Sequence, residues 1–349
     1  MSLKLTTMTL IFCFLLFPSI LLAQKFNLSF ATFWPSSDFQ VEEGHMKWIE
    51  EIEERSDGRI KINMHAGEAL LGAKEIYQGV EDGVADIGST CPSYTAGMFP
   101  LSEAFELPGY QNLSATAASM TCHQGYKKIK EELGIDEFKE VKVLTLWATG
   151  PGHLMTRKKP VRNLRDLSGM EIRAVGGTVP PLEALGAETH AMPMSESYLA
   201  LEQGIVDGIL GPTDILKGFK LAEVLDYSTN TPFLYNVVFM QIMNKETWKS
   251  LPPDLQKIVE EVSNDYALKY GKLRTHYTQQ GLEYGINDHG IETIELSPVE
   301  EKEWLERIDP VVENWINDMK EKNLPAKRVI EIIKNLDAKY SEKYPGLSN

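Results

Sequence analysis

The chain has 349 residues, of which 43% are hydrophobic, and carries a formal net charge of -15. This length and apolar content are enough for a packed core and for more than one domain. A strongly acidic surface repels nucleic acid and anionic lipid, which argues against both as partners. An anionic ligand would therefore need a local positive group.

The first 23 residues predict a secretory signal peptide. Lys4 supplies a positive start, residues 8–23 are almost wholly apolar, and Ala23 is a suitable cleavage residue. The alternative is an uncleaved membrane anchor, but the apolar run is short for a membrane span and is interrupted by Pro18. We therefore expect the mature protein to be soluble and exported.

The first half of the mature chain predicts alternating strands and helices. Apolar residues recur at every second position in the strands and with helical spacing in the helices. The predicted strands are residues 26–33, 60–64, 86–90 and 141–147. The predicted helices are residues 39–55, 73–82 and 113–133. This order is typical of an α/β lobe.

The second half predicts a similar lobe, then a helical end. Residues 148–160 are rich in Gly, Pro and basic residues and predict a crossing between lobes. Strands are expected at residues 171–175, 206–210, 225–231 and 237–243, and helices at 180–185 and 195–202. Residues 252–285 predict one unusually long helix that spans both lobes, and two amphipathic helices follow at 298–321 and 325–340.

Two distant segments share one pattern, YQGVEDGVAD at residues 77–86 and YLALEQGIVD at residues 198–207. Each predicts the end of a helix, a left-handed glycine cap and a buried strand. Two copies favour two lobes of similar design with a ligand cleft between them, beyond the carboxyl ends of the strands. The alternative is that this joint is common in α/β proteins and recurs by chance.

Sequence motifs of familiar enzymes do not occur in the chain. It has no G-x-S-x-G elbow, H-E-x-x-H helix, P-loop or G-x-G-x-x-G, and its histidines lack a spacing suited to a metal or a triad. A triad built from distant residues stays open. We predict a protein that is not an enzyme and uses no cofactor or metal. Cys91 and Cys122 are either a disulfide or two buried thiols.

One charged residue stands out in the segment LSGMEIRAVGG, residues 167–177. Arg173 lies late in an otherwise apolar strand, and Gly176 and Gly177 directly after it leave open space. A guanidinium at this end of a strand faces the cleft and suits a carboxylate, which it binds through two parallel hydrogen bonds. The alternative is an ion pair with one of the 50 acidic residues of the chain.

Three segments in this order and spacing resemble one protein family. They are DLSGMEIR at residues 166–173, MSESYLALEQGIVDGILGP at 194–212 and MNKETWKSLPPDLQ at 243–256. The chain resembles the extracytoplasmic substrate-binding proteins of TRAP transporters, the tripartite ATP-independent periplasmic family, over residues 25–340. The resemblance implies an α/β, periplasmic binding protein-like fold of type II, with two lobes, crossing strands and a long lobe-spanning helix.

The resemblance also implies function and organisation. Such proteins are not enzymes; they close on an organic acid and deliver it to integral-membrane permease subunits that an ion gradient drives. We expect a monomer. The chain then divides into a signal peptide (residues 1–23), lobe I (24–148 with about 232–255), lobe II (149–231), a connecting helix (256–285) and a C-terminal strand with helices (286–349).

The family pattern assigns roles at four positions. Arg173 matches the carboxylate-binding arginine, and His153 falls where some members, such as sialic-acid binders, have a second arginine. Gly211 replaces an asparagine that contacts the ligand in many members, so the substrate should differ. Cys91 replaces an acidic contact of the sialic-acid binders, which favours a less polar pocket or else a disulfide.

Six aromatic residues lie near predicted strand ends: Phe33, Trp34, Tyr94, Trp147, Phe233 and Tyr235. A single aromatic residue there more often closes a core, but six together predict at least two that line the cleft. We therefore expect a monocarboxylate with an apolar or aromatic body. Thr213, Asp214 and Asn236 are candidates to bind a hydroxyl or amino group, or else form turns and cap a helix.

Two other functions fit the same lobes. A periplasmic binding protein that serves a sensor would have the same cleft. A periplasmic enzyme would need a nucleophile or a metal and would turn over the bound acid.

Overall fold

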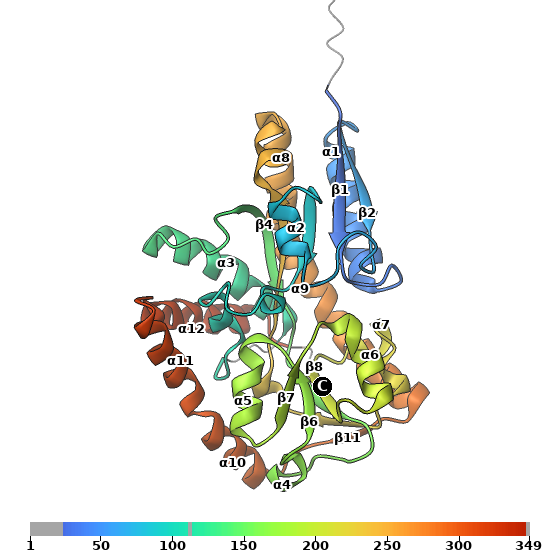
Figure 1. The fold of residues 1–349 in the computed structure, drawn as a ribbon, viewed down its shortest axis with the longest axis vertical. Coiled ribbons are helices and arrows are strands. Elements are labelled where there is room, and N and C mark those ends of the chain that lie inside the picture. The colour runs from blue at the N-terminus through green and yellow to red at the C-terminus, as the bar shows by residue number, and fades with distance from the viewer. Residues whose placement is uncertain (1–23, 111–113, 347–349) are drawn as a thin grey trace, which may run out of the picture.

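The computed structural model describes residues 24–110 and 114–346, so the predicted signal peptide lies outside it. The described chain folds into two mixed sheets, each with its own helices, and a long helix behind both (Figure 1). We name the two halves lobe I and lobe II, after their sheets. Within the described residues, no helix is both long enough and apolar enough to cross a bilayer.

Lobe I contains a five-stranded sheet in the order β2-β1-β3-β10-β4. The strands are β1 (Phe26–Thr32), β2 (Ile60–His65), β3 (Ile87–Thr90), β4 (Val141–Ala148) and β10 (Val238–Asn244). β1 runs parallel to β2 and β3, whereas β10 is antiparallel to β3 and β4. The helices of this lobe are α1 (Met46–Arg55), α2 (Ile76–Glu81), α3 (Ala115–Leu133) and α8 (Lys245–Ser250).

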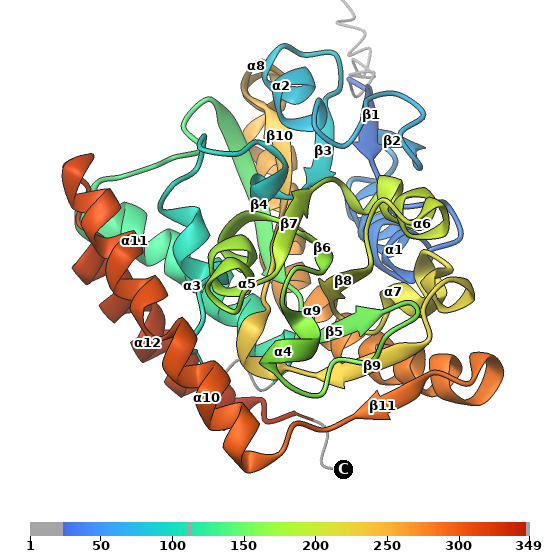
Figure 2. The same cartoon turned by 60° about the horizontal axis from the view of Figure 1, so that its bottom comes forward.

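Lobe II contains a six-stranded sheet in the order β11-β9-β5-β8-β6-β7, which Figure 2 brings forward. The strands are β5 (His153–Thr156), β6 (Glu171–Ala174), β7 (Glu188–Ala191), β8 (Gly208–Gly211), β9 (Tyr227–Asn230) and β11 (Glu292–Ile294). β6 runs parallel to β7 and β8, and β5 is antiparallel to β8 and β9. The short helices of this lobe are α4 (Leu164–Leu167), α5 (Val179–Ala184), α6 (Met194–Gln203) and α7 (Ile215–Gly218).

Short irregular helices lie near the ends of strands. They are the π-helix η1 (Gln40–His45) and the 3₁₀ helices η2 (Pro92–Tyr94), η3 (Ser102–Glu106), η4 (Gly176–Thr178), η5 (Leu221–Glu223) and η6 (Pro232–Leu234). η2 and η3 belong to lobe I, and both contact η4 of lobe II. This contact brings the segment after Arg173 against lobe I.

The repeated pattern forms the same joint in each lobe. α2 is followed by Gly83 at φ 78° and then β3, and α6 is followed by Gly204 at φ 74° and then β8. In these left-handed conformations a side chain is disfavoured, which explains the glycine in both copies. The structure confirms the predicted helix–glycine–strand joints.

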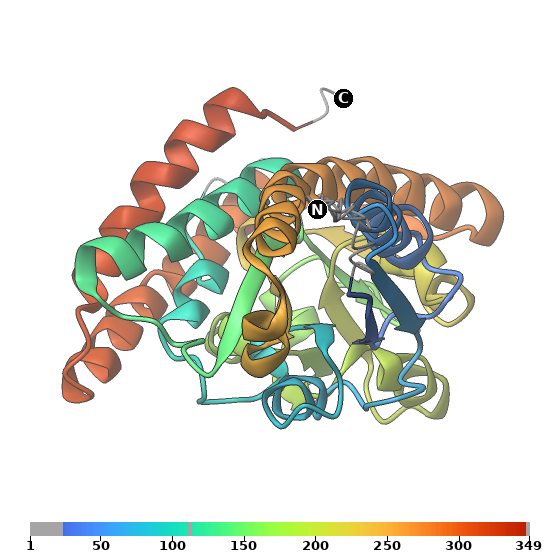
Figure 3. The same cartoon turned by 90° about the horizontal axis from the view of Figure 1, so that it is seen from above.

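The long helix α9 (Pro253–His289) crosses behind both lobes (Figure 3). It contacts α1, α3 and β4 in lobe I and α7 and η5 in lobe II. Glycines allow this close approach, because a Cβ at Gly271 would crowd Thr116 of α3, and one at Gly281 would overlap the backbone of Thr213. The helix ends later than predicted, at His289, and the left-handed Gly290 caps it.

Two predicted elements differ in the structure. Residues 153–156, expected within a loop, form β5 because they pair with strands on both sides. Residues 298–321, expected as one helix, are α10 (Pro298–Ile308) and α11 (Pro310–Glu321), since Pro310 lacks the N–H that would continue the hydrogen bonding. α12 (Ala326–Lys343) follows and packs on α3.

Candidate functional site

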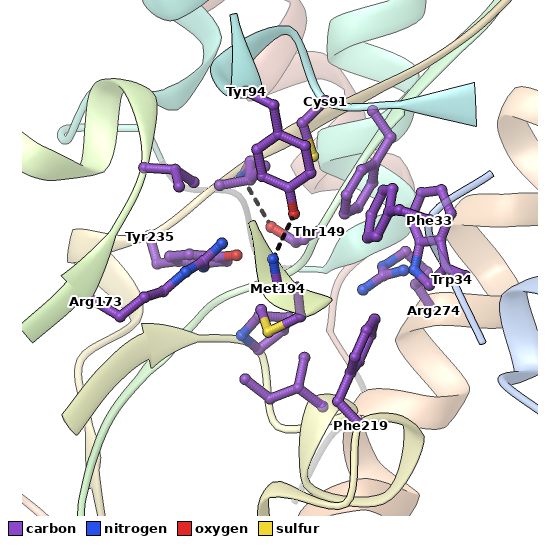
Figure 4. A pocket seen from close by; sticks show the side chains of 15 residues that line it. Phe33, Trp34, Cys91, Tyr94, Thr149, Arg173, Met194, Phe219, Tyr235 and Arg274 are labelled. Carbon is purple, nitrogen blue, oxygen red and sulfur yellow. Dashed lines mark hydrogen bonds between the residues drawn. The ribbon is translucent and has the colours of Figure 1, made fainter. Parts of the chain in front are cut away.

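A pocket lies between the lobes and α9 (Figure 4). Its walls come from the carboxyl ends of β1, β3, β6 and β8 and from the segment that returns to lobe I before β10. This is the place where open α/β sheets bind ligands.

Arg173 provides the positive charge of the pocket. It lies in β6 and is only 1% exposed. Its Nε and Nη2 donate to the carbonyl oxygen of Met192, at 3.0 and 2.7 Å. Among the described residues no carboxylate pairs with Arg173, so a buried positive charge faces the pocket without a counter-charge. Such a charge is costly unless an anion joins it.

Aromatic rings form one side of the pocket. The rings of Phe33 and Trp34 stack with their centroids 4.0 Å apart, and Tyr94 meets Phe33 edge to face at 5.3 Å. Phe219 of lobe II lies 6.5 Å from Phe33, and Phe239 packs 4.9 Å from Trp34. Figure 4 shows Tyr94 and Phe219 on opposite sides of the same space. These faces suit a planar apolar group.

A second arginine lies across the pocket from Arg173. Arg274 of α9 is 2% exposed and pairs through Nη2 with both carboxylate oxygens of Asp214, at 3.1 and 2.9 Å. Its guanidinium carbon lies 4.8 Å from the centroid of the Phe239 ring. The charge of Arg274 is therefore balanced within the protein, unlike that of Arg173.

Buried hydrogen bonds join the lobes beside the pocket. The Glu106 carboxylate accepts from Ser93 Oγ at 2.6 Å, from the N–H of Val238 and, across the lobes, from the N–H of Gly177, each at 3.0 Å. Burial raises the pKa of Glu106 to about 7. A Cβ at Gly176 would overlap this carboxylate, and its φ is 53°, so both space and backbone require glycine there.

The mouth of the pocket is also bridged. The hydroxyl of Tyr94 accepts from the N–H of Met194 at 3.1 Å, and Ser195 Oγ donates to Glu68 Oε1 at 2.7 Å. Tyr94 and Glu68 belong to lobe I, whereas Met194 and Ser195 begin α6 of lobe II. These bonds hold the lobes together across the pocket.

Five predicted ligand-binding residues line this pocket: Phe33, Trp34, Cys91, Arg173 and Tyr235. Cys91 and Cys122 are both buried free thiols. Burial raises the pKa of the Cys91 thiol, and the nearby Glu106 raises it further, so this thiol stays protonated. It offers the ligand a small, weakly polar surface.

Four other predicted residues lie outside the pocket lining. Trp147 is fully buried and its ring packs on Tyr270, with centroids 4.6 Å apart. His153 Nδ1 lies 2.9 Å from Ser228 Oγ, and burial lowers the pKa of His153 to about 4, so the ring is neutral near pH 7. Gly176 approaches Glu106, and Gly211 lies at the end of β8.

The remaining predicted residues bind other parts of the protein. Asn236 donates to the carbonyl oxygen of Phe105 at 3.0 Å, and Thr213 donates to that of Thr278 at 2.5 Å. Asp214 precedes α7, but its side chain makes no cap bond and pairs with Arg274. These side chains fix the pocket walls.

Sequence reasoning missed several lining residues: Thr149, Met194, Phe219, Phe239 and Arg274. Met194 lies in a segment that carries the family resemblance, and its place at the start of α6 was a usable signal. Arg274 had a weaker signal, an arginine on the apolar stripe of a long helix. In the described ranges, no cluster of three or more His, Cys, Asp or Glu residues could hold a metal.

Two lobes, a cleft at the strand ends and a buried cation are typical of a two-lobed solute-binding protein. Residues 30–318 match the bacterial extracellular solute-binding protein family 7 (DctP), and the chain belongs to this family. Among characterised relatives, the 2,3-diketo-L-gulonate-binding periplasmic protein YiaO of Escherichia coli K12 is 24% identical over 286 residues. That match covers 80% of this chain and 82% of YiaO.

Solved structures show the same fold. A TRAP solute-binding protein of Rhodoferax ferrireducens T118 with copurified benzoate has a TM-score of 0.85 at 28% identity, covering 91% of this chain and 99% of that one. A marine metagenome protein specific for aromatic acids, in complex with metahydroxyphenylacetate, has a TM-score of 0.84 at 28% identity, covering 90% and 99%. An open complex from Desulfovibrio salexigens has a TM-score of 0.77 at 35% identity, covering 93% and 99%.

Proposed function

We propose that this protein is the periplasmic component of a TRAP transporter that captures a monocarboxylate with an aromatic or apolar body. The observation that carries the proposal is Arg173, a buried guanidinium without a partner acid in the described chain, set in an aromatic pocket. The ligand carboxylate supplies the missing charge, and the rings of Phe33, Trp34 and Phe219 enclose its body.

Comparisons support this substrate class. The Rhodoferax protein holds benzoate, the metagenome protein holds metahydroxyphenylacetate, and a Bordetella bronchiseptica protein with a TM-score of 0.82 and 25% identity holds mandelate. Each of these ligands joins one carboxylate to an aromatic ring. The pocket described above offers one free cation and several rings, which suits the same combination.

Capture proceeds by hinge closure in this proposal. The ligand enters between separated lobes, and Arg173 of lobe II and the aromatic residues of lobe I bind it together. Because the ligand contacts both lobes only when they close, it favours the closed state by its differential affinity. Permease subunits in the membrane then receive the acid, and the bound molecule leaves chemically unchanged.

Native mass spectrometry of protein purified without refolding tests the proposal. We expect a copurified acid or, from ligand-free protein, binding of benzoate-like acids in preference to dicarboxylates and sugar acids. The recovered ligand should be unaltered after prolonged incubation. Binding of sugar acids or dicarboxylates alone, or conversion of the acid to a product, would contradict the proposal.

A further inference from the structure

The lining residue on the side of the pocket opposite Arg173 carries a buried donor that lacks an acceptor. Arg274 Nε is buried and has no hydrogen-bond partner among the residues that the structure describes. Arg274 lines the pocket, and Figure 4 shows it across from Arg173, beside Phe33 and Trp34. Buried N–H groups are nearly always paired, so this donor needs an explanation.

The guanidinium is fixed in place by the residues around it. Nη2 bonds to Asp214, and Nη1 lies 3.5 Å from Oε1 of Gln40. The rings of Phe39 and Phe239 lie 5.4 and 4.8 Å from its central carbon. The residue also belongs to the rigid 37-residue helix α9. The Nε donor therefore cannot turn toward another acceptor without breaking these contacts.

The charge at this end of the pocket is already balanced. Arg274 and Asp214 form a buried ion pair, with side chains that are each 3% exposed. Asp38 is a further buried acid near this pair; burial, together with the negative charge of Asp214, raises its pKa to about 7. A second carboxylate on the ligand would find no free cation here and would lie among acids. A neutral oxygen would find a donor.

We propose that Arg274 determines specificity by donating its Nε–H to a neutral oxygen at the end of the ligand opposite the carboxylate. The preferred ligands are then aromatic monocarboxylates that carry a hydroxyl or oxo group, rather than plain aromatic acids or dicarboxylates. This inference rests on the proposed function, in which the ligand carboxylate binds Arg173. In this inference, the two arginines bind the two ends of one ligand molecule.

Calorimetric titration with matched acids tests the inference. The panel contains benzoate and phenylacetate, their three ring-hydroxylated isomers, and the corresponding ring dicarboxylates. We expect one hydroxylated isomer to bind at least about tenfold more tightly than its parent acid, because the new bond involves a charged donor. The dicarboxylates should bind more weakly than the parent. Equal affinities for the parents and all hydroxylated isomers would overturn the inference.

The variant Arg274→Lys keeps a positive charge beside Asp214 but removes the Nε–H. The measured quantity is the ratio of the affinity for the hydroxylated acid to the affinity for the plain acid. This ratio should fall toward one, even if the variant weakens the binding of both acids. Arg307→Lys, an exposed site on α10, is the matched control and should keep the wild-type ratio. A ratio that Arg274→Lys leaves unchanged would overturn the inference, and if this variant does not fold, the wild-type ratios decide.

The same data separate this inference from the proposed function. Binding of plain aromatic acids to the wild-type protein reports on the proposed function alone. The increase in affinity that a ring hydroxyl produces reports on Arg274. If plain acids bind and no hydroxyl adds affinity, only the role of Arg274 fails. If no aromatic acid binds, the proposed function fails, and the role of Arg274 fails with it.

Discussion

Arg173 and Arg274 are almost equally buried, yet only Arg274 has an acidic partner in the described chain. The difference assigns them different tasks, since an unpaired buried charge is stable only when an anion arrives. The sequence predicted Arg173, because strand periodicity places it at a strand end next to two glycines. It did not predict Arg274, because which residues of a long helix meet a pocket depends on how the helix packs.

Gly176 gives a test at the level of one residue. Gly176→Ala should destabilise the protein by about 2–4 kcal/mol, because it adds strain at φ 53° to an overlap with the Glu106 carboxylate. Gly134→Ala is the matched control, since Gly134 has φ 67° but no atom within 4 Å of an added Cβ. Denaturant unfolding should show a loss of only about 1–2 kcal/mol there. Equal losses of unfolding free energy in the two variants would show that the added Cβ does not overlap the Glu106 carboxylate.

His123 supplies a pH test at the same scale. The N–H of Leu146 donates to its Nδ1, and burial lowers the pKa of His123 to about 3. The unfolded chain takes up a proton near pH 6.5 and the folded protein does not, so stability falls as pH drops below about 6.5. The loss is about 1.4 kcal/mol per pH unit.

His123→Gln removes this proton uptake. The difference in unfolding free energy between the variant and the wild type should therefore shift in favour of the variant as the pH falls from 6.5 to 5. Gln279→Asn changes an exposed side chain that does not titrate and serves as the control, for which we expect a constant difference. A pH-independent difference for His123→Gln would show that the folded protein already accepts the proton.

Among the elements, the start of α6 links Arg173, the residue proposed to bind the ligand, to lobe I. Arg173 donates to the carbonyl oxygen of Met192, the N–H of Met194 donates to Tyr94, and Ser195 donates to Glu68. A carboxylate held by Arg173 therefore lies within a few residues of the contacts that join the lobes. The helix α6 and the repeated joint at its end follow from sequence periodicity. The two bonds between the lobes, Met194 to Tyr94 and Ser195 to Glu68, could not be predicted in this way, because they join residues 100 or more positions apart.

Ser195→Ala tests the contact between the lobes without touching the pocket lining. The variant loses one bond that exists only when the lobes meet, so ligand affinity should fall about two- to tenfold. Ser250→Ala also removes one serine hydrogen bond, but that bond lies within α8 of lobe I, so affinity should not change. Calorimetry compares the two variants, and equal affinities would mean that the Ser195 contact does not favour the closed state.

At the level of the whole molecule, the two-lobed architecture follows from the order of strands and from the two copies of one joint. Local patterns could not separate α10 from α11 or find β5, because Pro310 lies inside a continuous amphipathic pattern and β5 is defined by its neighbours. The α9 glycines show the same limit. Their spacing has meaning only once Thr116 and Thr213 lie against the helix.

Calorimetric titration of Arg173→Met with the best-binding aromatic acid tests the central claim most directly. Removal of the guanidinium leaves a buried carboxylate without its counter-charge, so we predict a loss of about 2–5 kcal/mol, roughly 30- to 5000-fold in Kd. Thermal unfolding of the ligand-free variant checks that the lobes still fold. An affinity within twofold of the wild-type value, in a folded variant, would contradict the claim that Arg173 holds the ligand.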